Sequence, residues 1–232
     1  QCGRSFDLNM AGMDDTAALE SALKQAETVY HLAGQTSMNR SFVEPLLDFE
    51  QNALATVRLL QALRSMDNPP TLVYVTTAKV YGALHGLELE EIETRYIPCE
   101  HRIRLFGLSE EYPLLFDSPF SCSIGTADRY VLEFSNSFNI HTVILRVGTV
   151  YGPGDTAAGM NWVTNMMRAA VNAEPVTIFG NGKQVRDLLF IDDAVRALLV
   201  AENHMPLLES SAFNVGGGCT NSISLLEYIH HL

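Results

Sequence analysis

Arg186 is the side chain with the clearest capacity for binding chemistry. It lies in the block 180–187, which reads Gly-Asn-Gly-Lys-Gln-Val-Arg-Asp. A guanidinium group can hold two phosphate oxygens at once, so Arg186 is suited to bind a phosphate group. The alternative is a surface ion pair with Asp187 or Asp192, which follow it closely in the chain. The sequence leaves both interpretations open.

Few other side chains offer catalytic groups. Thr76 and Thr77 carry hydroxyl groups at the end of an apolar run. The thiol of Cys122 lies beside an expected helix start, where packing is the commoner role. We expect Lys79 to be solvent-exposed or held in a loop rather than catalytic. None of the eight tyrosines is followed by lysine at the fourth position, so no Tyr-x-x-x-Lys acid/base pair is present.

Composition excludes several classes of function. A net charge of −12 without any Lys/Arg run argues against nucleic-acid binding. No apolar run reaches membrane-spanning length and no signal peptide is visible. The four cysteines lie far apart and form no Cys-x-x-Cys pair. We therefore expect no metal site and no disulfide framework, and a cytoplasmic, reducing location.

The elements that must position these residues alternate between strands and helices. Buried apolar runs predict strands at 29–34, 72–75, 141–147 and 213–215, and helical spacing predicts helices at 17–26, 49–63, 123–138, 162–171 and 193–201. This order is typical of an α/β fold with a mostly parallel sheet. Ligands bind such sheets beyond the carboxyl ends of the strands, here 31–35, 76–82, 148–154 and 216–218. Further strands are expected at 176–179 and 185–191, and a long loop at 83–117.

Several motifs, taken in order, resemble those of the extended short-chain dehydrogenase/reductases, the NAD-dependent nucleotide-sugar epimerases and dehydratases. They are found at 31–34 (His-Leu-Ala-Gly), 76–82 (Thr-Thr-Ala-Lys-Val-Tyr-Gly), 118–130, 146–153, and 180–187 with 191–193. The resemblance covers essentially the whole chain. It implies a Rossmann-type, doubly wound parallel sheet that is incomplete at the N-terminus, with part of a small substrate lobe.

The resemblance also implies a division of the chain and of its site residues. Residues 1–151 would be a truncated NAD-binding domain without the glycine-rich loop. Residues 152–232 would be mainly a substrate-side lobe, from which 187–201 and 212–216 return to the sheet. NAD would contact Asp7, Leu8, His31, Leu32, Ala33, Gly34, Val75, Thr76 and Val147. The nucleotide sugar would contact Thr77, Lys79, Asn161 and Arg186, with Arg186 on the diphosphate.

One of these assignments has a structural alternative, and one further position matches a bracing residue of the family. His31 could equally be a hydrogen-bonded core histidine. Asn52 occupies the position of a helix asparagine that braces the active-site strand in the family.

The catalytic positions depart from the family pattern. The family carries Pro-Tyr-x-x-Ser-Lys, in which the tyrosine is the acid/base and the lysine lowers its pKa and holds the cofactor ribose. Here the catalytic positions are Thr77, Phe120 at the tyrosine position and Ile124 at the lysine position. Loss of a positioned acid/base costs about 10²–10⁴ in rate. We therefore expect slow turnover or none.

Two further departures concern the ends of the chain. The family's Gly-x-x-Gly-x-x-Gly loop, which places the NAD pyrophosphate on a helix N-terminus, has no counterpart here. Gly216, Gly217 and Gly218 lie at the wrong end of the chain to replace it. The chain also stops before the rest of the substrate lobe. We expect a fragment with an unpaired sheet edge, poor solubility and weakened or lost NAD binding.

Within the family, the nearest resemblance is to the epimerases of CDP-dideoxyhexoses, of the CDP-tyvelose (CDP-paratose) 2-epimerase type. It rests on 31–35, 93–96, 180–187 and 221–227. Such enzymes invert a hydroxyl carbon by transient hydride transfer to NAD, on sugars of surface polysaccharides. The alternatives are a catalytically silent relative that binds a nucleotide sugar or partners a complete paralogue, and a non-functional fragment. By analogy alone, a homodimer would form through helix 123–138.

Overall fold

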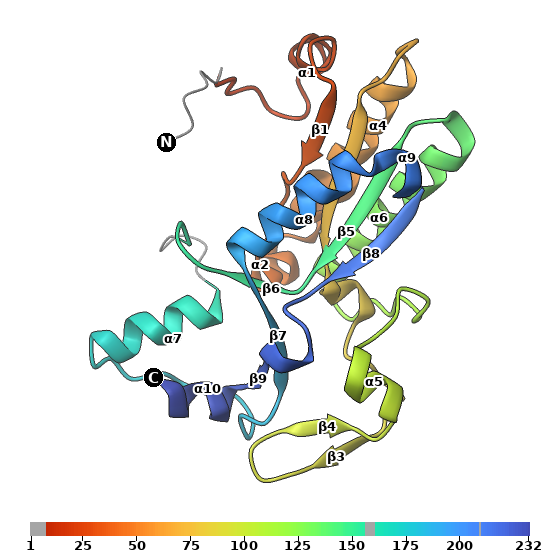
Figure 1. Cartoon of the computed structure of the whole chain (residues 1–232). Helices are drawn as coiled ribbons and strands as arrows, with labels where there is room; N and C mark the ends of the chain where they lie inside the picture. The colour runs from red at the N-terminus through yellow and green to blue at the C-terminus, as the bar shows by residue number, and fades with distance from the viewer. Residues whose placement is uncertain (1–7, 156–160, 209) are drawn as a thin grey trace.

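The centre of the molecule is a four-stranded parallel sheet. The computed structural model describes residues 8–155, 161–208 and 210–232. The strand order is β1-β2-β5-β8 (Figure 1), and every neighbouring pair is parallel. The strands are β1 (Thr28–His31), β2 (Thr71–Thr77), β5 (Thr142–Val147) and β8 (Ser211–Val215). The predicted parallel α/β fold is confirmed.

Helices cover both faces of this sheet because its side chains alternate between two apolar cores. Leu72 and Tyr74 of β2 enter a core with α1 (Thr16–Leu23), α4 (Ala55–Arg64) and α6 (Pro119–Phe138). Val73 points the other way, into a core with α8 (Ile191–Asn203) and α9 (Met205–Leu208). In Figure 1, α8 crosses in front of the sheet while α4 and α6 lie behind it. The sheet is therefore doubly wound.

Local sequence signals set the ends of the long helix α6. The Ser118 hydroxyl accepts a hydrogen bond from the Ser121 backbone N–H, the Ser121 hydroxyl contacts the Ser118 N–H in return, and Pro119 occupies the first turn. The helix ends at Asn139, which adopts a left-handed conformation with φ of 54°. Because this capping fixes the first turn, it also fixes the place of Phe120.

A second, smaller sheet lies below the carboxyl ends of the main strands (Figure 1). It has the order β6-β7-β9, with β6 (Thr149–Tyr151), β7 (Val185–Phe190) and β9 (Ser222–Ser224). Helices α7 (Trp162–Val171) and α10 (Leu225–His231) pack against it around Val163, Met166 and Tyr228. Residues 187–190 thus belong to the second sheet, and the return to the main sheet is made by α8 and β8. The division into domains stays a prediction.

Two expectations about local structure were wrong. The region 83–117 is not one long loop, because it holds the antiparallel pair β3 (Leu89–Glu91) and β4 (Tyr96–Pro98) and the helix α5 (His101–Phe106). These elements are too short to show periodicity. The predicted strand at 176–179 is no strand, and Phe179 is largely exposed. An apolar run forms a strand only where a neighbouring strand can accept and donate its backbone hydrogen bonds.

The predicted helix 49–63 is interrupted near its start. It is preceded by α2 (Met38–Val43) and α3 (Pro45–Phe49), and a π-helical turn, η1 (Glu50–Leu54), joins α3 to α4. Single π turns within helices occur frequently at functional sites. The turn buries Asn52 and Ala53. It therefore directs the Asn52 side chain toward the end of β1.

Two remaining features bear on the expectations above. In the described part of the chain, β1 pairs only with β2, so one of its edges is open, as predicted. None of the helices built from the described residues is both long and apolar enough to cross a membrane.

Two short 3-10 helices follow strands of the main sheet. They are η2 (Ala78–Tyr81) after β2 and η3 (Cys219–Asn221) after β8.

Candidate functional site

The carboxyl ends of the four parallel strands meet at one edge of the sheet. Thr77 of β2 lies beside Val147 of β5, and Val147 lies beside Val215 of β8. The Gly148 N–H donates to the Val215 carbonyl over 2.9 Å. The structure therefore brings together the segments that sequence reasoning assigned to the ligand.

Asn52 braces the end of β1 as predicted. Its Oδ1 accepts a hydrogen bond from the Gln35 N–H at 2.8 Å, and its Nδ2 donates to the Ser123 hydroxyl of α6 at 2.9 Å. A Cβ atom on Gly34 would stand 2.7 Å from Oδ1, so only glycine fits there without a shift. Beside this brace, Leu32, Ala33 and Gly34 are exposed. The predicted cofactor-side segment is thus held in place and open to a ligand.

A buried carboxylate that sequence reasoning missed completes this brace. Asp48 is 1% exposed and accepts hydrogen bonds from the Gln35 Nε2 at 2.7 Å and the Ser123 hydroxyl at 2.5 Å. The Asn52 Nδ2 donates to it at 3.2 Å. The four-residue spacing of Asp48 and Asn52 was the available signal, since such residues neighbour one another on a helix. The network ties the end of β1 to the helix that carries Phe120.

His31 is a core histidine, which was the structural alternative. It is 3% exposed and its ring stacks on Tyr74. The Thr56 hydroxyl donates to the Asn52 carbonyl at 2.7 Å, so it accepts from the His31 Nε2–H at 2.9 Å. Burial lowers the pKa of His31 to about 4. The ring offers no exposed edge to a ligand.

The buried His31 predicts a pH-dependent stability. Its folded pKa of about 4 lies below the ordinary 6.5, so the unfolded chain takes up the proton first as the pH falls. The free energy of unfolding should therefore drop between pH 6.5 and 4, by about 3 kcal/mol from this residue. Urea unfolding of a His31→Gln variant across this range should lack that component. The matched variant His85→Gln, at an exposed histidine, should keep it. Identical pH profiles for both variants would refute the assignment.

The two departing catalytic positions lie on the first turns of α6. Phe120 is 4% exposed, and the Lys79 Nζ lies 5.3 Å from the centroid of its ring. Ile124 is half-buried one turn further along. The Thr77 hydroxyl accepts from the Lys79 N–H at 3.3 Å and so caps η2. The structure therefore places the Lys79 amine near the ring of Phe120.

Arg186 does not form either ion pair that was considered for it. Within the described ranges it makes no salt bridge, and its Nη1 donates to the Val185 carbonyl at 2.9 Å. Arg186 is exposed, and partial desolvation of its guanidinium lowers its pKa. Lys79 is exposed, as predicted. Partial desolvation and then the nearby Arg186 lower its pKa, while Asp117 raises it in part. Two cations that lack a bound carboxylate attract an anion to this region.

Gly216 and Gly217, which follow β8, allow the backbone to pack closely against β7. The Gly217 N–H donates to the Asp187 Oδ1 at 2.7 Å. A Cβ atom on Gly216 would stand 1.8 Å from the Asp187 Oδ2, and one on Gly217 1.8 Å from the Leu188 carbonyl oxygen. Burial raises the pKa of Asp187, and the Gly217 hydrogen bond opposes this. The run therefore fixes β7, the strand of Arg186, against β8.

The remaining predicted site residues are less informative. Asp7 lies outside the described residues, and Leu8 is exposed. Val75 and Val147 are half-buried near their strand ends, and the Thr76 hydroxyl is buried with no hydrogen-bond partner within the described residues. Asn161 caps α7, and both ends of its side-chain amide are used within the protein. Among the residues described, no cluster of His, Cys, Asp and Glu is arranged to hold a metal ion.

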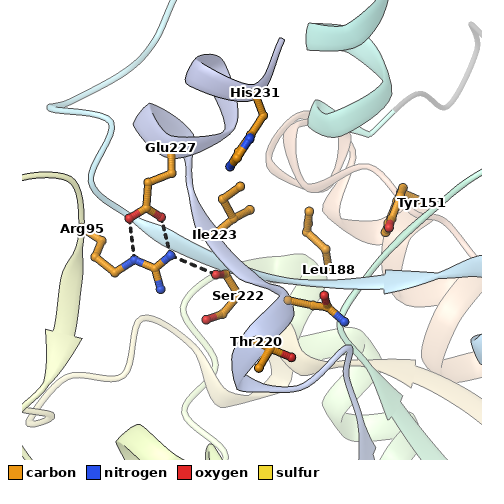
Figure 2. Close-up of a pocket in the computed structure, with 9 residues that line it drawn as sticks. Arg95, Tyr151, Leu188, Thr220, Ser222, Ile223, Glu227 and His231 are labelled. Carbon is orange, nitrogen blue, oxygen red and sulfur yellow. Dashed lines mark hydrogen bonds and ion pairs between the residues drawn. The ribbon is translucent and has the colours of Figure 1, made fainter.

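A pocket of about 440 Å³ lies beside the second sheet. Figure 2 shows Arg95 reaching Glu227 and Ser222 at one side, with Tyr151 at the other. The Arg95 Nε donates to the Glu227 Oε1 at 2.7 Å, and this contact is the main cause that lowers the pKa of Glu227 to about 2. Neither Lys79 nor Arg186 lines the pocket. Arg95, Tyr151 and several residues of 221–227 belong to segments that carried the family resemblance, but the sequence did not predict that they line one pocket.

Comparison with known proteins supports the motif resemblance. The model of the NAD dependent epimerase/dehydratase family matches residues 3–216. CDP-paratose 2-epimerase of Salmonella typhi is 38% identical over 207 residues, which are 87% of this chain and 60% of that protein. A putative UDP-glucose 4-epimerase of Methanocaldococcus jannaschii is 28% identical over 211 residues, 90% of this chain and 61% of that protein.

Solved structures agree with the fold. MoeE5 in complex with UDP-glucose and NAD has a TM-score of 0.75 and 28% identity, covering 91% of this chain and 63% of that one. UDP-glucose 4-epimerase from Thermotoga maritima, solved with UDP-glucose, has a TM-score of 0.78 at 24% identity, over 96% of this chain and 65% of that one. The chain thus spans about three fifths of the length of its curated relatives.

Proposed function

The chain belongs to the NAD dependent epimerase/dehydratase family, and from that premise we propose that its strand ends bind a nucleotide sugar. Arg186 would hold the diphosphate, Thr77 would hydrogen-bond the sugar, and Lys79 would lie beside it. Asn161 stays a proposed substrate contact. The reaction would be NAD-dependent epimerisation of a CDP-dideoxyhexose, by transient hydride transfer.

One observation carries this proposal. Arg186 lies close enough to Lys79 to lower its pKa, yet neither side chain makes an ion pair within the described residues. Like charges this close repel each other, and an anion bound between them would relieve that repulsion. A diphosphate supplies that anion, and Arg can bind two of its oxygens.

The residues at the end of β1 fit a bound dinucleotide in part. Leu32, Ala33 and Gly34 are exposed, and the Asn52 brace holds the backbone there in one conformation. When bound, NAD accepts a hydride from the substrate and returns it. Ile124 supplies no cation for the cofactor ribose, so we propose that this chain binds NAD weakly or not at all.

Phe120 and Ile124 favour a second candidate function. Neither side chain can carry a proton, and Phe120 is buried where the reacting hydroxyl would be. A chain with intact diphosphate contacts and no acid/base would be a catalytically silent nucleotide-sugar binder or the partner of a complete paralogue. Turnover separates the two functions, since only the first produces an inverted sugar.

The finer parts of the proposal rest on the likeness to CDP-paratose 2-epimerase. They are the CDP-dideoxyhexose substrate and a role in polysaccharide biosynthesis. A cytoplasmic location is proposed from the free, exposed Cys99, Cys122 and Cys219. A homodimer is proposed through α6, on which Tyr130 is 45% exposed. Sedimentation of the chain and of a Tyr130→Glu variant tests it, because only a dimer through α6 would dissociate.

An Arg186→Met variant tests the diphosphate site. Removing one charged, hydrogen-bonding group should weaken CDP binding by about 10- to 150-fold, which corresponds to ~1.5–3 kcal/mol. Calorimetry measures the change. The control is Arg196→Met, because Arg196 lies on α8 and its side chain is 75% exposed. If both variants bind CDP as the parent chain does, Arg186 is not the diphosphate ligand.

A further inference from the structure

The turn that joins β3 to β4 is tied to a segment far away in the chain. Arg95 in this turn donates from Nε to the Glu227 Oε1 at 2.7 Å, and from Nη2 to the other carboxylate oxygen and to the Ser222 carbonyl (Figure 2). The Thr94 hydroxyl donates to the same carboxylate at 2.6 Å. The side chains of Arg95 and Glu227 are 26% and 18% exposed. The pair is therefore better shielded from water than an ordinary surface ion pair.

These contacts hold β9 at both of its ends. Arg95 binds the carbonyl of Ser222, the first residue of the strand, at 3.1 Å. At the last residue, the Ser224 hydroxyl donates to the Thr94 carbonyl at 2.7 Å and the Ser224 N–H donates to Glu227 at 2.9 Å. A strand of three residues forms few ladder hydrogen bonds of its own. The position of β9 therefore depends on the turn between β3 and β4.

The position of Arg186 depends in turn on β9. Arg186 of β7 lies opposite Ile223, the middle residue of β9, in an antiparallel pair. The pairing of β7 with β6 begins only at Leu188, so within the described residues β9 is the strand beside Arg186. The Arg186 side chain is exposed and has one hydrogen bond, to the adjacent Val185 carbonyl. Its direction is therefore set mainly by its backbone.

The same hairpin also holds the segment that leads into β7. The Tyr96 N–H donates to the Lys183 carbonyl at 3.1 Å, and the Asn181 Nδ2 donates to the Tyr96 hydroxyl at 2.7 Å. The Lys183 Nζ donates to the Glu91 carboxylate at 2.8 Å. Both β9 and the start of β7 are thus fixed to one hairpin, and Arg186 lies where the two strands pair.

We propose that Arg95 is a positioning residue for the anion site: with Glu227 it fixes β9, and through β9 it holds the Arg186 guanidinium where it can bind a diphosphate. The inference rests on the proposed function and extends it from the ligand's contacts to the hairpin that supports them. Two-pronged binding of phosphate oxygens needs such support, because it demands a defined orientation of the guanidinium plane. Arg95 acts from a distance, since it lines the pocket beside the second sheet and Arg186 does not.

A Glu227→Gln variant separates positioning from a simple effect of charge. Glutamine keeps the shape and an acceptor for the Ser224 N–H, but it loses the charge that binds Arg95. Removing a negative charge alone would strengthen the binding of an anion. Loss of positioning should instead weaken CDP binding, by about tenfold, the low end of what residues that orient binding groups contribute. Calorimetric titration with CDP measures the change, and urea unfolding checks that the variant is folded.

The matched control is Glu90→Gln at the base of the same hairpin. Glu90 lies 3.6 Å from Arg104, and the two side chains are 59% and 43% exposed. This variant loses the same charge without touching β9, so its CDP affinity should not fall. Unchanged or tighter CDP binding in Glu227→Gln, or an equal loss in Glu90→Gln, would overturn the positioning role.

A double-mutant cycle provides the second test. Arg95→Met should weaken CDP binding about tenfold in the parent chain, yet cause no further loss in an Arg186→Met background, because no guanidinium is left to position. The same loss in both backgrounds would show that Arg95 acts directly or through general stability, and would contradict the proposal. If Arg186→Met weakens CDP binding and Arg95→Met does not, the positioning role alone is wrong. If the parent chain does not bind CDP, the proposed function fails and this inference fails with it.

Discussion

Replacing Asp128 with asparagine should lower the free energy of unfolding by about 3–5 kcal/mol, because it strands a buried cation. Arg146 is 2% exposed and Asp128 is 0% exposed. The Arg146 Nε and Nη2 each donate to one Asp128 oxygen at 2.8 Å, and Nη1 donates to the Tyr81 hydroxyl at 3.0 Å. An asparagine of nearly the same shape removes the charge and one acceptor. The guanidinium then remains buried without a counter-ion.

The matched control is an ion pair at the surface. Asp193 and Arg196 of α8 lie 3.2 Å apart, with side chains 57% and 75% exposed. Asp193→Asn should change the unfolding free energy by less than about 1 kcal/mol, as surface pairs usually do. Urea unfolding of both variants measures the difference. Equal losses would mean that the Arg146 pair is not the buried brace described above.

The same pair also has a positional effect on the site. Tyr81, which contacts Arg146, donates its hydroxyl hydrogen to the Asn214 Oδ1 of β8 at 2.7 Å. The network therefore joins α6, β5 and β8 to η2, the turn that carries Lys79. Loosening it should weaken CDP binding as well as the fold.

Restoring tyrosine at 120 and lysine at 124 should raise epimerase turnover by about 10²–10⁴ over the parent chain. Both positions lie on α6 one helical turn apart, so the new side chains project from the same face. The tyrosine would supply an acid/base, and the lysine would lower its pKa and offer the cofactor ribose a cation. Inversion of a CDP-dideoxyhexose in the presence of NAD, followed by chromatography, measures the gain.

A second pair on the same helix provides the control for the restored residues. Phe134→Tyr with Phe138→Lys introduces the same residue types with the same spacing, at the other end of α6. That variant should show no gain. If the restored chain binds CDP and NAD but turns over no faster than the parent, the silent-binder function is the correct one.

The sequence predicted those features that rest on regular patterns. Continuous apolar runs identified β2 and β5 because strands buried on both faces need apolar side chains at every position. The alternation of strands and helices then placed Thr77 and Val147 at the same edge of the sheet. Motif order assigned Asn52 to the brace that the structure shows.

The features that could not be predicted from the sequence depend on contacts between residues far apart in the chain. The Asp48 carboxylate meets Ser123 across 75 positions in the chain, and no local pattern encodes that pairing. The strands β3 and β4 have three residues each, too few for alternation to emerge. The proximity of Lys79 to Phe120 likewise arises from the packing of η2 against the loop before α6. The sequence also left open whether His31 faces a ligand or the core. The answer depends on its hydrogen bond to Thr56, a contact that forms only in the folded chain.

Calorimetric titration of the unmodified chain with CDP, and separately with NAD, examines the diphosphate site and the cofactor side in one protein. We expect CDP to bind and NAD to bind weakly or not at all. The cations Arg186 and Lys79 are present, whereas the ribose-holding position is Ile124. Binding of neither ligand would contradict the proposed nucleotide-sugar site.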